Sequence, residues 1–183
     1  MRRQLWFGAL AGSLALIVAG CGGSAGPAGS ESPMPTSSAP RAAAGPAGPH
    51  LGQCGSVTDA EVAAATGMPQ PMRAVRDTVG CQWDVGTLGV GSHVSFTWYR
   101  GSPIGRERAI DNAVGRDVSD VTIGGRPGFS SRIGPSLCEV GVDYGADFFL
   151  WSVDYGADTA GPPEGGVCDA ATSLAAMTAE RAQ

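Results

Sequence analysis

The chain has 183 residues, of which 17 are acidic and 12 are basic, and its formal net charge is −5. Every basic residue is an arginine and no segment concentrates them, so the composition argues against nucleic acid or an anionic lipid surface as a partner. The chain holds two histidines and no lysine, which leaves few side chains for a catalytic or metal centre.

The N-terminal residues have the three parts of a secretory signal. Met1-Arg2-Arg3 is positively charged, Leu5 to Val18 is largely apolar, and small residues precede Cys21. We therefore predict a lipoprotein signal peptide over residues 1–20 and lipidation of Cys21. The lipid would anchor the chain to the extracytoplasmic face of the cell membrane, in the cell envelope. A transmembrane anchor is the alternative, but the apolar run is shorter than the roughly 20 residues that a spanning helix needs.

Residues 21–50 contain the predicted lipidated cysteine and then mostly Pro, Gly, Ala, Ser and Thr. Such a segment buries too little apolar surface to offset the entropy of ordering, so a flexible tether is predicted. Its serines among prolines also resemble an O-glycosylated stalk, and an unmodified tether is the other interpretation. A single globular domain is expected over residues 51–183, which is enough chain for one core.

Four cysteines besides Cys21 lie in the predicted domain. An even number of cysteines in a small exported domain indicates disulfides, and no pair has the short spacing of a zinc site. Four cysteines allow three pairings. We favour Cys54–Cys81 and Cys138–Cys168, because sequential pairing closes short loops.

The first helix of the domain has a complete N-terminal signal. Thr58 can act as the N-cap, Glu61 completes a capping box, and Val57 can pack against Val62. Gly67 then ends the helix.

Two further helices are expected. Ser102-Pro103 can open the second helix, with Ile110, Ala113 and Val114 as its apolar stripe. The last helix is predicted over Asp169–Glu180.

The strands are predicted from alternating or continuous apolar patterns, as in His93–Arg100, where Val94, Phe96 and Trp98 share one face. Short connections favour antiparallel pairing. The predicted fold class is therefore α+β, a mostly antiparallel sheet with helices packed on one face and two disulfides. The predicted strands are Gly80–Asp84, His93–Arg100, Val118–Ile123, Leu137–Asp143 and Phe148–Val153, and Gly124-Gly125 forms a turn into Arg126–Phe129.

The sequence contains no set of side chains typical of catalysis. His93 is the only imidazole in the predicted domain, and a solvated histidine on a strand is the preferred interpretation. The repeated motif Val-Asp-Tyr-Gly-Ala-Asp offers Asp143, Asp147, Asp154 and Asp158 as oxygen ligands for a hard cation. Because Asp and Gly are ordinary turn residues, no metal site is predicted. No cofactor is predicted either, and the lack of a catalytic set of side chains means that the chain is not expected to be an enzyme.

The segment Phe148–Trp151 places bulky side chains on both faces of one strand, because adjacent strand residues point to opposite faces. Either helices or loops cover the second face, or this face forms a cleft for an apolar ligand or a partner. Phe149, Trp151 and Phe129 are the candidate residues of this surface, with Arg126 at its rim. A salt bridge to a nearby acid is the alternative role for Arg126.

Taken together, these features resemble the mycobacterial Lpr-type lipoproteins (LprB- and LprC-like), a family with a domain of unknown function. The resemblance implies an exported, lipid-anchored domain with two disulfides, and it brings no established activity. Gly55-Ser56 departs from the two apolar residues that the family usually has after its first domain cysteine. The matching segments are the lipobox at Cys21, the Pro-rich tether, Cys54 before Thr58-Asp59-Ala60-Glu61-Val62, Cys81-Gln82-Trp83, Gly125-Arg126-Pro127-Gly128, Cys138-Glu139-Val140 and Cys168.

We therefore expect an exported, lipid-anchored cell-envelope lipoprotein that acts as a non-catalytic binding or interaction module. Its expected partners are the membrane, through the anchor, and either an envelope protein or an apolar ligand; no nucleic acid is expected. The alternative function is a carrier of a lipid or another apolar envelope molecule. A large apolar cavity would favour the carrier, whereas a filled core with an exposed aromatic patch would favour the interaction module.

Overall fold

The computed structural model describes residues 48–70, 72–86, 91–156, 162 and 165–183. The predicted signal peptide, Cys21, the tether up to residue 47 and Asp158 lie outside these residues, so the expectations for them stay predictions. None of the described helices is long and apolar enough to cross a membrane.

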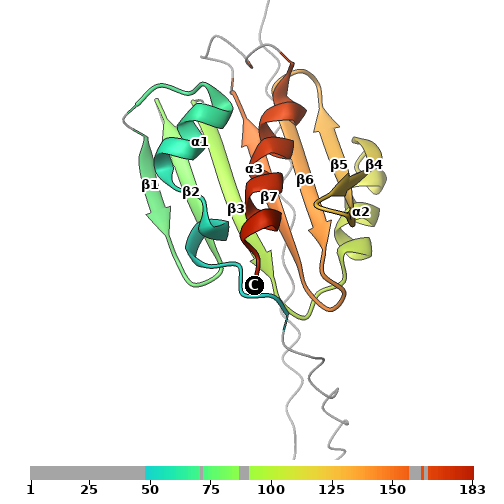
Figure 1. Cartoon of the computed structure of the whole chain (residues 1–183). Helices are drawn as coiled ribbons and strands as arrows, with labels where there is room; N and C mark the ends of the chain where they lie inside the picture. Colours follow the sequence, from blue (N-terminus) through green and yellow to red (C-terminus); the bar gives the residue numbers. More distant parts are fainter. Residues whose placement is uncertain (1–47, 71, 87–90, 157–161, 163–164) are drawn as a thin grey trace, which may run out of the picture. The chain divides into compact units, whose positions relative to one another are not determined.

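A seven-stranded antiparallel sheet forms the centre of the fold (Figure 1). Its strand order is β1-β2-β3-β7-β6-β5-β4, so a three-stranded and a four-stranded meander join where β3 pairs with β7. The strands are β1 (Arg73–Arg76), β2 (Gly80–Val85), β3 (Ser92–Tyr99), β4 (Asp117–Ile123), β5 (Arg126–Ile133), β6 (Leu137–Asp143) and β7 (Phe148–Asp154).

The helices cover the two faces of the sheet unequally. The helices α1 (Asp59–Thr66) and α3 (Val167–Arg181) lie together on one face, in front of the sheet in Figure 1, with the 3-10 segment Gln53–Ser56 beside them. The helix α2 (Ile104–Ala113) packs on the other face, over β4, β5 and β6. The predicted α+β class is confirmed, and α2 is the one helix that departs from the expected single layer.

The main core lies between the sheet and α3. Trp83 and Trp151 stack with their ring centroids 5.6 Å apart, and Phe96 packs against Trp151 at 5.2 Å. The indole Nε1 of Trp151 donates a hydrogen bond of 2.9 Å to Thr178 of α3, which satisfies its polar atom in the interior. A smaller cluster lies beneath α2 and consists of Phe129, Phe148 and Leu150, with Tyr99, Ile104 and Val118 packed against it.

The two predicted disulfides are present. Cys54–Cys81 joins the 3-10 segment to β2, and Cys138–Cys168 joins β6 to the first turn of α3. Both bridges therefore tie the helical layer to the sheet, on the face that carries the main core.

The first helix forms as its sequence predicts. The hydroxyl of Thr58 accepts a hydrogen bond from the backbone N–H of Glu61, and the Glu61 carboxylate accepts one of 2.9 Å from the N–H of Thr58. Gly67 ends the helix in the left-handed conformation, with φ of 67°. All of these signals are local, so they need no tertiary information.

The predicted apolar stripe of α2 is wrong. Ile110 is 46% exposed and Val114 is 66% exposed, whereas Asp111 is only 2% exposed and lies toward the sheet. The helix is held by ion pairs and by Ile104, and its remaining apolar side chains face outward. The packing partners of α2, rather than its own periodicity, decide which face is inside.

Two strands were not predicted. β1 has only four residues, and β5 contains Pro127 and Gly128, which are typical of turns. Pro127 is tolerated because it pairs with Thr122 on β4, while the pairing of β5 with β6 begins one residue later, at Gly128. The missing N–H of the proline therefore leaves no gap in the second ladder.

Candidate functional site

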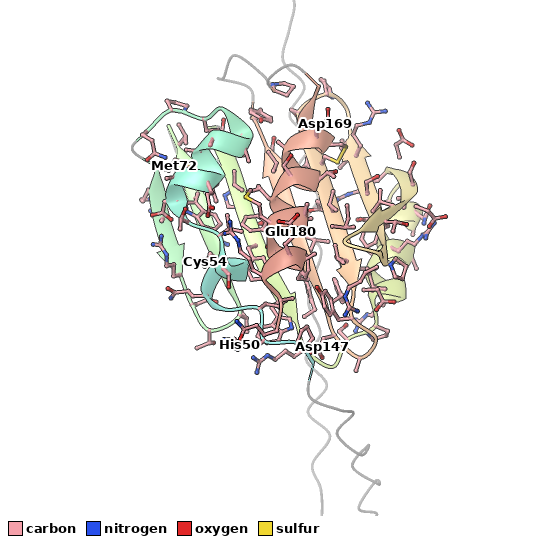
Figure 2. The ribbon with its side chains drawn as sticks, in the orientation of Figure 1. His50, Cys54, Met72, Asp147, Asp169 and Glu180 are labelled. Atoms are coloured by element: carbon pink, nitrogen blue, oxygen red, sulfur yellow. A yellow bond between two sulfur atoms is a disulfide. The ribbon has the colours of Figure 1, made fainter. Side chains whose placement is uncertain are left out.

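The first and last described residues meet at one end of the sheet. The N–H of His50 donates to the carbonyl of Gln183 at 2.8 Å, and the N–H of Gln183 donates back to His50 at 3.2 Å. The turn between β6 and β7 lies at the same end, as the labels for His50 and Asp147 show in Figure 2. The chain therefore enters the domain at the end that also holds its C-terminal residue and the β6–β7 turn.

An open cleft of about 480 Å³ lies at this end of the domain. Its walls come from the incoming chain, the start of β5, the β6–β7 turn and the C-terminal end of α3. The lining residues are Gly48, Pro49, Arg126, Tyr144, Gly145, Ala146, Ala179, Ala182 and Gln183.

The chemistry of the cleft is set by Arg126 and Tyr144. The guanidinium carbon of Arg126 lies 3.9 Å from the ring centroid of Tyr144, which is a cation–π arrangement. Within the described residues, no carboxylate forms an ion pair with Arg126. Burial raises the pKa of Tyr144, although the Arg126 guanidinium opposes this shift, so the ring stays a neutral phenol at physiological pH. The cleft thus presents one positioned guanidinium that no carboxylate of the described residues pairs with.

Asp147 lies against the incoming chain beside this cleft. Its carboxylate is buried and accepts a hydrogen bond of 2.8 Å from the N–H of Gly101. Gly48 lies directly against the same carboxylate, and a Cβ at that position would come within 2.0 Å of Oδ2. A larger residue at position 48 would therefore have to displace the Asp147 carboxylate.

The predicted aromatic surface is wrong. Phe149 and Trp151 are 0% exposed and Phe129 is 1% exposed, so all three belong to the interior. The reason is that α3 covers one face of β7 and α2 covers the other, which is the first of the two alternatives considered for this strand. Arg126 is exposed, but it borders the cleft beside Tyr144 rather than an apolar groove.

The predicted titratable residues lie in other places. His93 is on the open half of the sheet, and its Nδ1 is 2.9 Å from the Asp84 carboxylate, which also pairs with Arg73 at 2.6 Å. Burial acts to raise the pKa of Asp84, but the contacts with His93 and Arg73 together outweigh it, and the pKa is lowered. This row of polar side chains crosses β1, β2 and β3, so His93 is part of a cross-strand ladder.

Asp143 and Asp154 of the repeated motif do not converge. Asp143 pairs with Phe148, whereas Asp154 pairs with Leu137, which places them at opposite ends of the β6–β7 hairpin. Each accepts a hydrogen bond from a backbone N–H two residues further on, as turn aspartates do. Among the residues that the structure describes, no group of three His, Cys, Asp or Glu side chains could hold a metal ion.

A second open cleft, of about 550 Å³, lies at the start of α1. Its charged residues, Asp59 and Arg76, form an ion pair, and the Asp59 carboxylate also accepts a hydrogen bond of 2.7 Å from the indole of Trp83. These contacts, with the indole bond as the largest cause, lower the pKa of Asp59. The charges here satisfy one another, which distinguishes this cleft from the one at Arg126.

Sequence reasoning missed Tyr144, Gly48 and the end of α3 as parts of the cleft. The tyrosine stands in the repeated motif, but only its aspartates were weighed as site residues. The contributions of Gly48 and Ala182 come from opposite ends of the domain sequence and carry no local signal.

Comparison with known proteins identifies the family. A family model described as "Protein of unknown function (DUF3558)" matches residues 16–181. A Mycobacterium bovis protein named "Putative lipoprotein LprB" is 40% identical over 163 residues, covering 86% of this chain and 84% of its own length. A Mycobacterium leprae protein of the same name is 41% identical over 145 residues, covering 76% of this chain and 75% of its own length. No solved structure matches. The chain therefore belongs to the DUF3558 family, as a lipoprotein similar to the mycobacterial LprB proteins, and the function of this family is unknown.

Proposed function

We propose that this lipoprotein is a non-catalytic binding module of the cell envelope, held at the extracytoplasmic face of the cell membrane by lipid on Cys21. The domain would bind an envelope protein through the Arg126 cleft. The observation that carries the proposal is the positioned Arg126 guanidinium over Tyr144, which has no carboxylate partner among the described residues. An acidic side chain of a protein partner is the group that this charge would recognise.

The packing supports a surface role over the carrier alternative. A carrier needs an enclosed apolar cavity, and the aromatic side chains that would line one pack against each other and against α3 instead. Both described clefts are open, and both have polar residues in their walls. The proposed module therefore binds its partner at a surface cleft and not within its core.

The non-catalytic part of the proposal rests on how the polar residues are used. The Nδ1 of His93 contacts Asp84, and the hydroxyl of Ser92, its neighbour in the sequence, donates to the carbonyl of Tyr155. Neither contact sets a nucleophile beside a base.

The binding role can be tested by site-specific photocrosslinking in mycobacterial cells. A photoreactive amino acid replaces Ala146, which is exposed in the cleft, or Ser119, which is exposed on β4 as the control position. We expect a discrete protein adduct from position 146 and none from position 119. Arg126→Ala should remove the adduct, whereas Arg132→Ala should leave it, because Arg132 pairs with Asp117 away from the cleft. Identical adducts from both positions, or an adduct that survives Arg126→Ala, would contradict the proposal.

The anchor is tested separately. Cys21→Ala should move the protein from the detergent phase to the aqueous phase in a phase-partition experiment, because the acyl chains would be lost. Retention in the detergent phase would mean that the N-terminal apolar segment itself is the anchor.

A further inference from the structure

The interface between α2 and the sheet is built around polar side chains. Asp111 points from α2 toward the sheet and is 2% exposed. Arg116 follows the helix and bridges two carboxylates: its Nη1 lies 3.3 Å from Asp111, and it also forms an ion pair with Glu139 on β6. The three groups therefore form one partly buried network, with two acids sharing a single guanidinium.

Three polar side-chain atoms at this interface lack a protein hydrogen-bond partner among the described residues. They are Oδ2 of Asp111, Nε of Arg116 and Oγ of Ser131, and all three are buried. Ser131 is 0% exposed and stands directly opposite Glu139 in the β5–β6 ladder. Residues that face each other across two strands have Cβ atoms about 4.5–5.5 Å apart on the same face of the sheet. Ser131 therefore lies beside Glu139, while Asp111 contacts Arg116 from the helix.

The hydrogen-bonding capacities of these atoms are complementary. The Arg116 Nε–H is a donor, the Asp111 Oδ2 is an acceptor, and the Ser131 hydroxyl can act as either. Leaving such a group buried and unpaired is destabilising, and buried side-chain polar atoms in folded proteins are nearly always paired. A single molecule able to accept one bond and donate two would satisfy all three.

We propose that this network is a binding site for structural water beneath α2, in which water accepts from Arg116 Nε and donates to Asp111 Oδ2 and Ser131 Oγ. Water is the chemical class that fits, because it is small and because a buried water needs two to four polar partners, which the unpartnered atoms of Asp111, Arg116 and Ser131 supply. The site explains why Asp111 of α2 points inward while Ile110 and Val114 point outward. The helix covers polar side chains and their bound water at this position, and not an apolar surface.

The direction in which one substitution changes the melting temperature tests the site. If water is bound, Ser131→Ala removes one of its hydrogen bonds, and the melting temperature of the full chain should fall by about 2–5 °C. If the site is dry, the same substitution removes an unpaired buried hydroxyl, and the melting temperature should stay or rise. Ser130→Ala is the matched control, because Ser130 is the next residue, is only half-buried and faces the other side of the sheet, toward Val140. This control should change the melting temperature by about 1 °C or less.

A crystal structure provides the direct readout. Ordered water within hydrogen-bond distance of both Asp111 Oδ2 and Arg116 Nε would support the proposal. A direct bond between these two atoms, with no density between them, would overturn it, as would a melting temperature that Ser131→Ala leaves unchanged or raises.

Discussion

The apolar side chains of α3 face the sheet, whereas Ile110 of α2 faces outward, and two substitutions by alanine test this difference. Leu174 of α3 is fully buried against the sheet, whereas Ile110 of α2 is 46% exposed. Leu174→Ala loses the transfer free energy of the removed atoms and leaves a cavity, which together cost about 3 kcal/mol. Ile110→Ala loses about half of one side chain's burial energy and gains helix propensity, so its net cost is about 1 kcal/mol or less.

The assay is urea and thermal unfolding of a non-lipidated form of the mature chain, followed by circular dichroism. For a domain of this size, Leu174→Ala should lower the melting temperature by roughly 10 °C and Ile110→Ala by roughly 3 °C or less. The slope of the urea transition should stay the same in both variants, because neither changes the surface exposed on unfolding by much. Equal costs for the two substitutions would refute the outward orientation of Ile110 and restore the stripe that the sequence predicts.

Three further outcomes follow from the local contacts. Thr58→Ala should cost about 1 kcal/mol in urea unfolding, because it removes the side-chain half of the capping box with Glu61; a loss below about 0.3 kcal/mol would mean that the cap is not formed. Replacing Cys138 and Cys168 together by Ser opens a disulfide that spans 30 residues and should cost roughly 3–4 kcal/mol, and no change under non-reducing conditions would show that the pair is not bridged. Burial, with Asp111 nearby, raises the pKa of Glu139 above its unfolded value, so the stability that its proton contributes is complete below the unfolded pKa and is lost as the pH rises through the folded pKa. Glu139→Gln should therefore be more favourable relative to the parent at pH 7 than at pH 4, and an equal difference at both pH values would contradict the shift.

Local signals in the sequence predict the elements whose structure depends on near neighbours. The capping box of Thr58 and Glu61, the ending of α1 at Gly67 and the alternation in β3 all involve contacts within a few residues. The sequential disulfides also follow from short loops, and the structure has both.

The remaining features depend on tertiary contacts that no local pattern encodes. Pro127 and Gly128 indicate a turn when read alone, and only the neighbouring strands make them the start of β5. The continuous apolar run of β7 is compatible with a strand covered on one face or on both faces. In the structure both faces are covered, because α2 packs over the second one. For the same reason, Phe149 and Trp151 are core residues, and only Arg126 of the four predicted surface residues remains on the surface.

We propose that this lipoprotein binds an envelope protein at its surface and does not carry an apolar ligand in its core. Native mass spectrometry of the oxidised domain secreted from a mycobacterial host tests that claim most directly. The account predicts the bare polypeptide mass, reduced by the hydrogens lost in forming the two disulfides. A reproducible additional mass that leaves on denaturation would contradict it and would identify the protein as a carrier.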